Sequence, residues 1–150
     1  MDSEITDMIL VENTVKGKKN EDIKIKTKIW DTPGHERFVY LVLSEVKKTE
    51  GIFLVYDITL RNTFYDLNRW IDRIKKYKDI SNFPIIIIGN KVDLKAKREV
   101  SKEESQQFAD SNHIPYFEVS AFKGEGVKEA FSTLIQKVYE SKLTNKKEIK

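Results

Sequence analysis

Three short, largely apolar runs dominate the second half of the chain, at residues 52–57, 83–89 and 114–119. In the first two, apolar residues follow one another with no polar residue between them. A strand that is covered on both faces of a sheet has this composition, because neither face meets water. The runs therefore predict interior strands of a sheet with helices packed on both faces.

Segments of helical periodicity separate these runs. The first begins near residues 62–63, and its apolar side chains recur at helical spacing: Phe64, Leu67, Trp70, Ile71, Ile74 and Tyr77. Ser101-Lys102-Glu103-Glu104 has the spacing of a capping box, which predicts the start of a second helix. Residues 127–138 carry the apolar stripe of a third. Strand and helix thus alternate from residue 52 to residue 140, which predicts an α/β fold with a parallel sheet.

The first part of the chain has a different pattern. Residues 8–15 and 23–30 predict two strands, and the turn residues at 17–20 between them predict a hairpin. On the second strand isoleucine and threonine alternate with lysine, which gives it one apolar and one polar face. Residues 38–48 are predicted to form a short helix.

The loop after this hairpin has the sequence Trp30-Asp31-Thr32-Pro33-Gly34-His35-Glu36-Arg37-Phe38. In an open α/β sheet, ligands bind at the carboxyl ends of strands, which is where Asp31 lies. Its carboxylate can hold Mg²⁺, and Gly34 lets a backbone N–H approach a phosphate oxygen where a Cβ would clash. Asp, Pro and Gly are also common turn residues, so an ordinary turn is the alternative interpretation.

A second polar motif, Asn90-Lys91-Val92-Asp93, directly follows the apolar run that ends at residue 89. Guanine presents N1–H and an exocyclic amino group, two parallel donors that one carboxylate accepts bidentately, whereas adenine has no such pair. Asp93 has the chemistry for this contact. Asn90 can bond the base or a neighbouring loop, and the stem of Lys91 can cover the ring. A polar loop with an Asx turn is the alternative here.

A third motif, Ser120-Ala121, follows the run that ends at residue 119. The three motifs resemble the D-x-x-G, N-K-x-D and S-A-K motifs of GTP-binding proteins, in that order along the chain. Here the third residue of the last motif is Phe122 instead of Lys, and a phenyl ring can still cover a base by stacking. With Leu54-Val55-Tyr56-Asp57-Ile58-Thr59 and Arg98-Glu99-Val100, the resemblance to Rab and Ras small GTPases extends from about residue 23 to 140.

The resemblance implies a small-GTPase type of sheet that binds GTP or GDP with Mg²⁺. By the family pattern Asp31 serves the metal, Gly34 the γ-phosphate and His35 the attacking water. The same pattern assigns the guanine base to Asn90, Lys91, Asp93, Ser120 and Ala121. Residues 34–50 would form part of the surface that effectors or regulators recognise.

The chain departs from the family in its first part. Small GTPases hold the phosphates in a P-loop, G-x-x-x-x-G-K-[S/T], and none of the six glycines here begins that pattern. Only 22 residues precede Ile23, whereas a strand, crossover and strand need roughly 30 or more. We therefore expect a sheet without the family's first strand and helix, and so without the P-loop and first switch: an incomplete domain over 1–141 and a short basic tail over 142–150. The strands at 23–30 and 52–57 would then either pair directly or leave unpaired edges.

Two functions remain open on this evidence. One is a Rab-like switch coupled to GTP hydrolysis, in which His35, placed as in the D-x-P-G-H form of translational GTPases that this stretch resembles, positions the water. Without a P-loop such a chain is expected to be inactive or very weak. The alternative is a non-catalytic pseudo-GTPase interaction module or a truncated gene product. The apolar run at 39–43 would then bind a partner or fill the gap left by the absent strand.

Composition narrows the class of partner. The 27 basic and 24 acidic residues give a net charge of +3 that is scattered along the chain, which does not favour nucleic-acid binding. The chain has no cysteine, so it has neither disulfides nor a site for a prenyl anchor. No apolar stretch approaches the length of a membrane span. We expect a cytoplasmic chain without a direct membrane anchor, membrane-peripheral only if a missing tail or a partner supplies one.

Overall fold

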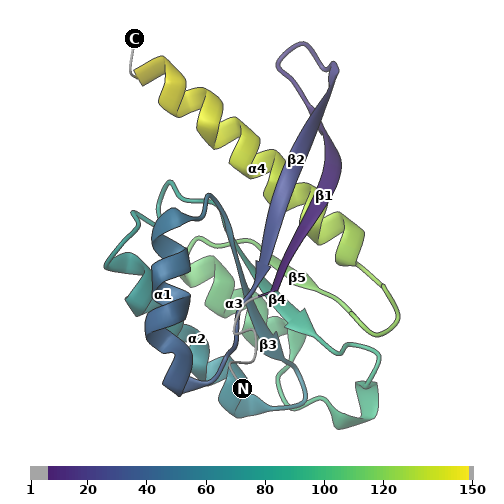
Figure 1. Ribbon diagram of the computed structural model, residues 1–150. Helices are drawn as coiled ribbons and strands as arrows, with labels where there is room; N and C mark the ends of the chain where they lie inside the picture. The colour runs from purple at the N-terminus through teal and green to yellow at the C-terminus, as the bar shows by residue number, and fades with distance from the viewer. Residues whose placement is uncertain (1–6, 149–150) are drawn as a thin grey trace. The chain divides into compact units, whose positions relative to one another are not determined.

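The computed structural model describes residues 7–148 of the chain (Figure 1). It divides into two compact units, one ending at Thr49 and the other beginning at Glu50. Each unit is described by itself below. Within residues 7–148 no helix combines the length and the apolar composition needed to cross a membrane.

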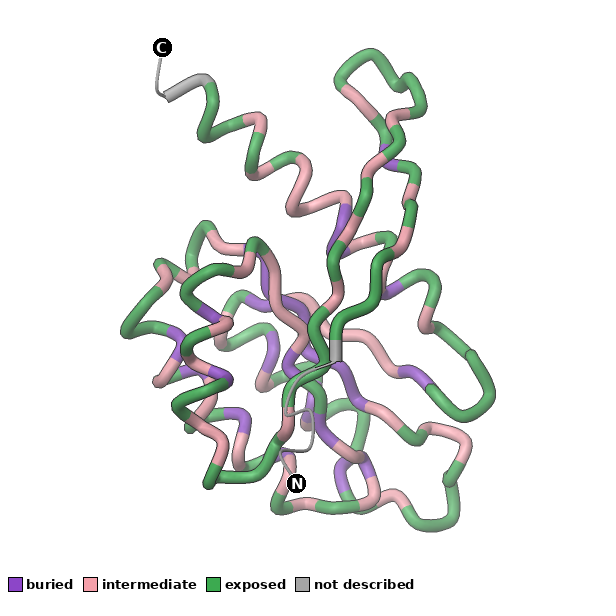
Figure 2. Tube along the Cα trace, viewed as in Figure 1, coloured by how far each residue is buried: buried purple, intermediate pink, exposed green. Residues whose placement is uncertain are grey.

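The first unit begins with the hairpin that the sequence predicts. Strands β1 (Asp7–Lys16) and β2 (Asp22–Asp31) pair antiparallel, with Val15 opposite Ile23 and Met8 opposite Trp30. The turn is closed by backbone hydrogen bonds between Gly17 and Glu21 and between Gly17 and Asn20. Along β2, exposed and half-buried residues alternate, as expected from the lysine pattern (Figure 2).

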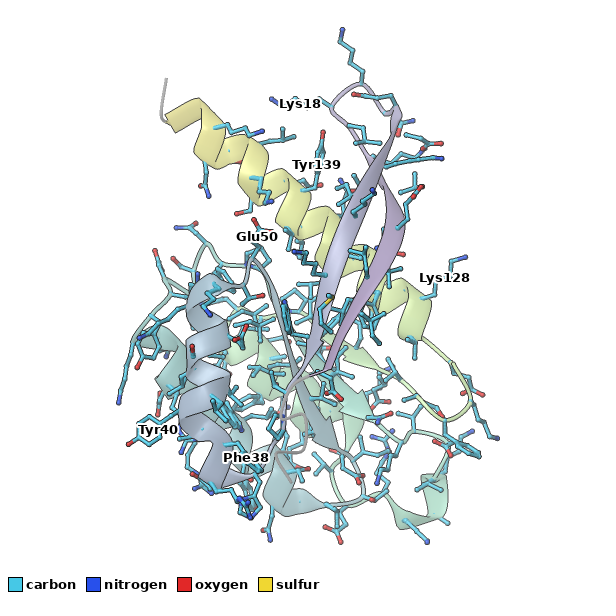
Figure 3. The ribbon with its side chains drawn as sticks, in the orientation of Figure 1. Lys18, Phe38, Tyr40, Glu50, Lys128 and Tyr139 are labelled. Carbon is cyan, nitrogen blue, oxygen red and sulfur yellow. The ribbon has the colours of Figure 1, made fainter. Side chains whose placement is uncertain are left out.

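A short helix completes the first unit. After a single 3-10 turn, η1 (Glu36–Phe38), helix α1 runs over Val39–Lys48 and confirms the helix expected there. It ends at Thr49, whose N–H still donates to the carbonyl of Glu45. Tyr40 projects outward from α1 (Figure 3) and is 85% exposed.

The second unit is built on a parallel sheet. Its strands β3 (Ile52–Asp57), β4 (Ile85–Asn90) and β5 (Tyr116–Glu118) lie in that order, with β4 at the centre. Residues 85–89 are buried because they lie between two strands and between two layers of helices. The third strand is shorter than the predicted span of 114–119. Pro115 has no N–H to give to a ladder.

Three helices cover the sheet: α2 (Arg61–Lys75), α3 (Lys102–Ser111) and α4 (Val127–Glu148). The ring of Phe64 on α2 packs edge-on against Tyr56 of β3 and against Phe108 of α3. Residues on the opposite face of the sheet, among them Ile86 and Ile88, form a core with Ala130 and Leu134 of α4. Helices on both faces confirm the predicted α/β architecture.

Two details differ from expectation or resolve an alternative. Helix α4 continues to Glu148, through most of the stretch for which the sequence predicts a basic tail. Among residues 7–148, β2 pairs only with β1, and the hairpin and the three-stranded sheet are separate sheets. The direct pairing of the strands at 23–30 and 52–57 is therefore wrong.

Candidate functional site

The loop after β4 is fastened to the loop after β5 by its own polar groups. The side-chain oxygen of Asn90 accepts the N–H of Ala121 at 3.0 Å, and the N–H of Val92 donates to the carbonyl of Val119 at 3.2 Å. Between these contacts Lys91 has a φ of +71°, in the left-handed region that a side chain rarely adopts. The backbone is therefore held in a tight turn at the carboxyl end of the central strand.

Ser120 joins Asp93 to this turn. It is fully buried, and its hydroxyl donates to Oδ1 of Asp93 at 2.8 Å while accepting the N–H of Lys123 at 3.1 Å. Two backbone hydrogen bonds to Glu125 hold Ser120 in place. Each carboxylate oxygen has two acceptor positions, so the Asp93 carboxylate keeps capacity for a bidentate ligand. Its orientation is fixed before any ligand arrives.

The N–H of Ala121 is less available than the sequence suggests. A serine-alanine motif of this kind offers its backbone N–H to a guanine carbonyl, but here that N–H already donates to Asn90. A ligand carbonyl must share the donor or displace the amide oxygen. The structure thus brings together Asn90, Asp93, Ser120 and Ala121, with Ala121 as a shared donor.

Lys91 has a partner that sequence reasoning missed. Its ammonium lies 2.7 Å from Oδ2 of Asp57, whose other oxygen accepts the N–H and hydroxyl of Thr59 at 2.8 and 2.7 Å. Partial burial alone would raise the pKa of Asp57, but hydrogen bonds from Lys91 and Thr59 outweigh it and hold that pKa below its usual range. The spacing Asp57-x-Thr59 at a strand end is an Asx-turn signal that could have identified this residue.

Beneath the loops, a buried chain of hydroxyl groups crosses the sheet. The hydroxyl of Tyr56 lies 2.5 Å from that of Ser105 and 2.8 Å from that of Tyr116, which donates to Glu118 at 2.8 Å. Arg98 completes the chain with two hydrogen bonds to the Glu118 carboxylate, at 2.8 and 3.0 Å. Sequence reasoning missed this network, because its members lie as many as 60 residues apart.

Burial governs the ionisation of this network. It raises the pKa of both tyrosines, so their hydroxyls stay protonated and able to donate. Burial alone would also raise the pKa of Glu118, but the hydrogen bonds from Arg98 and Tyr116 outweigh it, and the pKa lies below its usual value. Glu118 is therefore a charged, fully partnered group two residues before Ser120.

A glycine makes room for this chain at the end of β4. A Cβ at Gly89 would lie 2.6 Å from the hydroxyl of Tyr116 and 2.8 Å from that of Tyr56. Both distances are shorter than van der Waals contact, so any side chain here forces the two tyrosines apart. Next to this chain, a cleft of about 510 Å³ opens beside Asp93, and Arg98 and Glu118 are among its lining residues.

The loop after β2 lies in the other unit and has few internal contacts. Asp31, Gly34 and His35 are all exposed. A Cβ at Gly34 would meet no atom within 4 Å, so no neighbouring group requires glycine there. Within residues 7–148 no cluster of three or more acidic, His or Cys side chains is placed to hold a metal ion. Asp31 alone is an incomplete ligand set for Mg²⁺, which completes its octahedron with water and phosphate oxygens.

His35 has a structural contact that sets its protonation. Its Nδ1 accepts the N–H of Arg37 at 3.2 Å and so caps η1. In a neutral imidazole the other nitrogen then carries the hydrogen, so Nε2 is a donor. Nε2 can orient a water or a phosphate oxygen by donation. It can accept a proton from water only if the cap to Arg37 opens.

Comparison with known proteins places this architecture. Parallel strands with helices on both faces and polar loops at the strand ends are the framework of ligand-binding α/β proteins. A model of the Ras family matches residues 2–140. The chain belongs to the Ras family, as a small GTPase of the Rab type.

Three relatives illustrate the match. The chain is 39% identical over 116 residues to the GTP-binding protein ypt3 of Schizosaccharomyces pombe, which covers 77% of this chain and 54% of ypt3. It is 35% identical to the Ras-related protein RABA2a of Arabidopsis thaliana, over 93% of this chain and 63% of that protein. Identity to RABA4b of the same plant is 36%, over 99% and 64% respectively. The chain thus spans between half and two thirds of the length of these relatives.

Proposed function

We propose that this chain binds guanine nucleotides and recognises the base with the loops after β4 and β5. The observation that carries the proposal is the Asp93 carboxylate, whose orientation is fixed by the buried hydroxyl of Ser120 at 2.8 Å. A carboxylate aimed in advance accepts the N1–H and amino group of guanine without losing side-chain entropy on binding. Adenine offers no matching pair of donors, so the site favours GTP and GDP over ATP.

The neighbouring residues have distinct roles in this proposal. The N–H of Ala121 is shared between Asn90 and the guanine carbonyl, and Asn90 holds the two loops together. Lys91, whose ammonium is paired with Asp57 at 2.7 Å, presents its alkyl stem to a ring face. No group in this set needs to ionise or change partners for the base to bind.

The phosphate side of the proposal rests on the loop after β2. Asp31 would supply one ligand to Mg²⁺, Gly34 an N–H to the γ-phosphate, and His35 a donor to water or phosphate. Bound Mg²⁺ would offset the charge of the phosphates. Because Nδ1 of His35 caps η1, we expect GTP hydrolysis by this chain to be very slow.

The contribution of the phosphates is expected to be small. None of the six glycines of this sequence begins a G-x-x-x-x-G-K-[S/T] pattern, which supplies most triphosphate contacts in the family. Contacts to the base alone correspond to a roughly millimolar Kd, on the order of 4 kcal/mol. GTP, GDP and GMP are therefore expected to bind this 150-residue chain with similar affinities.

A competition titration tests this proposal. The purified chain is titrated with a fluorescent GTP analogue and Mg²⁺, and unlabelled GTP, GMP or ATP is added as competitor. We expect saturation near millimolar concentrations, with displacement by GTP and GMP but not by ATP. Equal displacement by ATP would contradict base recognition. A micromolar Kd with GTP far better than GMP would show that this chain has a phosphate site of its own.

A second candidate function is a non-catalytic interaction module. It is favoured by the apolar run at the start of α1, where Tyr40 is 85% exposed and Leu41 is 46% exposed, although Val42 and Val46 are buried. On this proposal residues 34–50 bind an effector or regulator protein and no nucleotide is needed. The same titration separates the candidates, because the module predicts no saturation at any nucleotide concentration.

A further inference from the structure

Phe122 is the most exposed large apolar side chain among the described residues, at 90%. It lies in the loop between β5 and α4, directly after Ala121. An aromatic ring that is almost fully hydrated gains free energy when another surface covers it. Such a ring on an otherwise well-packed unit is therefore informative about what the loop contacts.

The backbone on both sides of Phe122 is fixed. The N–H of Ala121 donates to Asn90, and the N–H of Lys123 donates to the Ser120 hydroxyl at 3.1 Å. The loop closes where Ser120 and Glu125 exchange two backbone hydrogen bonds. Phe122 is thus a free side chain on a rigid support, one residue from a member of the base-binding group.

The glycines that follow Phe122 preserve this support. Gly124 and Gly126 both have a φ of +73°. A Cβ at Gly126 would lie 2.8 Å from the carbonyl oxygen of Glu118. The close approach of Gly126 to Glu118 anchors the loop to the end of β5, so the loop cannot drift away from Asp93 to bury its own phenylalanine.

We propose that Phe122 stacks on the face of the guanine base whose edge is bound by Asp93, and that it sets affinity but not selectivity. The inference rests on the proposed function. Asp93 acts in the plane of the base, whereas a ring can act only on its face. Every base has a π-face, so stacking adds affinity without distinguishing bases. Discrimination then remains with the hydrogen bonds of Asp93.

The division of roles gives a quantitative test with GMP and IMP as probes. Inosine keeps N1–H but lacks the exocyclic amino group, so the ratio of the two Kd values reports the Asp93 contact alone. Nuclear magnetic resonance titrations would be made on the unaltered chain, on Phe122→Ala and on Phe122→Trp. Tyr65→Ala serves as the matched control, because it removes a 55% exposed aromatic ring from α2.

We expect Phe122→Ala to raise the Kd for both nucleotides by about tenfold and to leave the GMP to IMP ratio unchanged. Phe122→Trp should keep or improve the affinity, and Tyr65→Ala should change neither Kd. The ring protons of Phe122 should shift upfield when GMP is added to the unaltered chain.

Two results would overturn the inference while leaving the proposed function intact. One is an unchanged Kd in Phe122→Ala, and the other is a change in the GMP to IMP ratio with no upfield shift of the Phe122 ring. If the unaltered chain shows no saturation with GMP, the proposed function and this inference fail together. Each variant is first checked for an unchanged amide spectrum outside the loop between β5 and α4.

Discussion

The two stretches that the sequence marks as chemically active differ in how firmly the chain holds them. Around Asp93, a buried serine, an asparagine and paired backbone groups fix every element before a ligand binds. Around Asp31, the residues are exposed, and the contact that shapes the loop is a 3.2 Å cap from His35. A preorganised site binds without ordering cost, whereas a loosely held loop gains order from its ligand. The comparison indicates that base recognition is intrinsic to the second unit and that order in the phosphate-side loop depends on ligand.

The rigid side of the comparison should break most severely at Gly89. In Gly89→Ala the new methyl group overlaps the hydroxyls of Tyr56 and Tyr116 and separates them. We expect the free energy of unfolding to fall by about 2–3 kcal/mol, the upper range for overpacking a filled core. Denaturant unfolding measures this, with fluorescence of Trp70 as the probe in a Trp30→Phe background that leaves one tryptophan. An unchanged midpoint would show that the tyrosine chain does not support the loops.

Glu118→Gln removes one charge from the same network without changing its shape. Arg98 keeps a hydrogen-bond partner but loses its counter-ion, and both side chains are largely buried, at 25% and 17% exposed. The expected loss at neutral pH is about 1.5–2 kcal/mol. The exposed pair between Lys16 and Asp22 provides the control, because breaking it with Asp22→Asn should cost at most about 0.5 kcal/mol.

The pH dependence of these two chains sharpens that result. The pKa of Glu118 lies below its ordinary value of 4.5 in the folded chain, so its contribution is complete above that pH. It is lost as the pH falls below 4.5 and through the folded-state pKa. The free energy of unfolding should therefore decline more steeply in the unaltered chain than in Glu118→Gln below pH 4.5. Parallel curves would mean that the carboxylate is not stabilised by folding.

The loosely held loop should respond least. His35→Ala removes an exposed side chain and a cap on a three-residue turn, so the unfolding free energy should change by no more than about 0.5 kcal/mol. The affinity for GMP, which has no γ-phosphate, should not change. Amide hydrogen exchange should become faster over residues 35–38 and stay unchanged over residues 90–93. Altered exchange at the second stretch would show that the two regions are not independent.

The sequence predicts the parallel sheet well because buried strands and amphipathic helices leave strong periodic signals. Helix α3 begins after Ser101, whose hydroxyl accepts the N–H of Glu104 at 3.1 Å, as the capping-box spacing predicts. The end of α4 is not predicted, because the apolar stripe stops before the helix does. Beyond Gly126 there is neither proline nor glycine to end it, and lysine and glutamate are good helix formers.

The candidate site is predicted in part for a similar reason. Asn90, Asp93 and Ser120 each follow a strand, and strand ends in a parallel sheet share one edge, so their proximity follows from topology. The pairing of Lys91 with Asp57 and the hydroxyl chain beneath it depend on which side chains meet across the sheet. No local pattern records those contacts. The protonation of His35 likewise depends on a single contact to the backbone of Arg37.

The most direct test of the central claim is to invert the donor pattern that Asp93 recognises. In Asp93→Asn the amide can still accept one hydrogen bond but now donates another, which matches xanthine, whose C2 carries an oxygen where guanine has an amino group. Titrations with GMP and xanthosine monophosphate would be compared by nuclear magnetic resonance. The account predicts that the unaltered chain prefers GMP and that Asp93→Asn prefers the xanthine nucleotide. The same preference order in both chains would contradict recognition of guanine by Asp93.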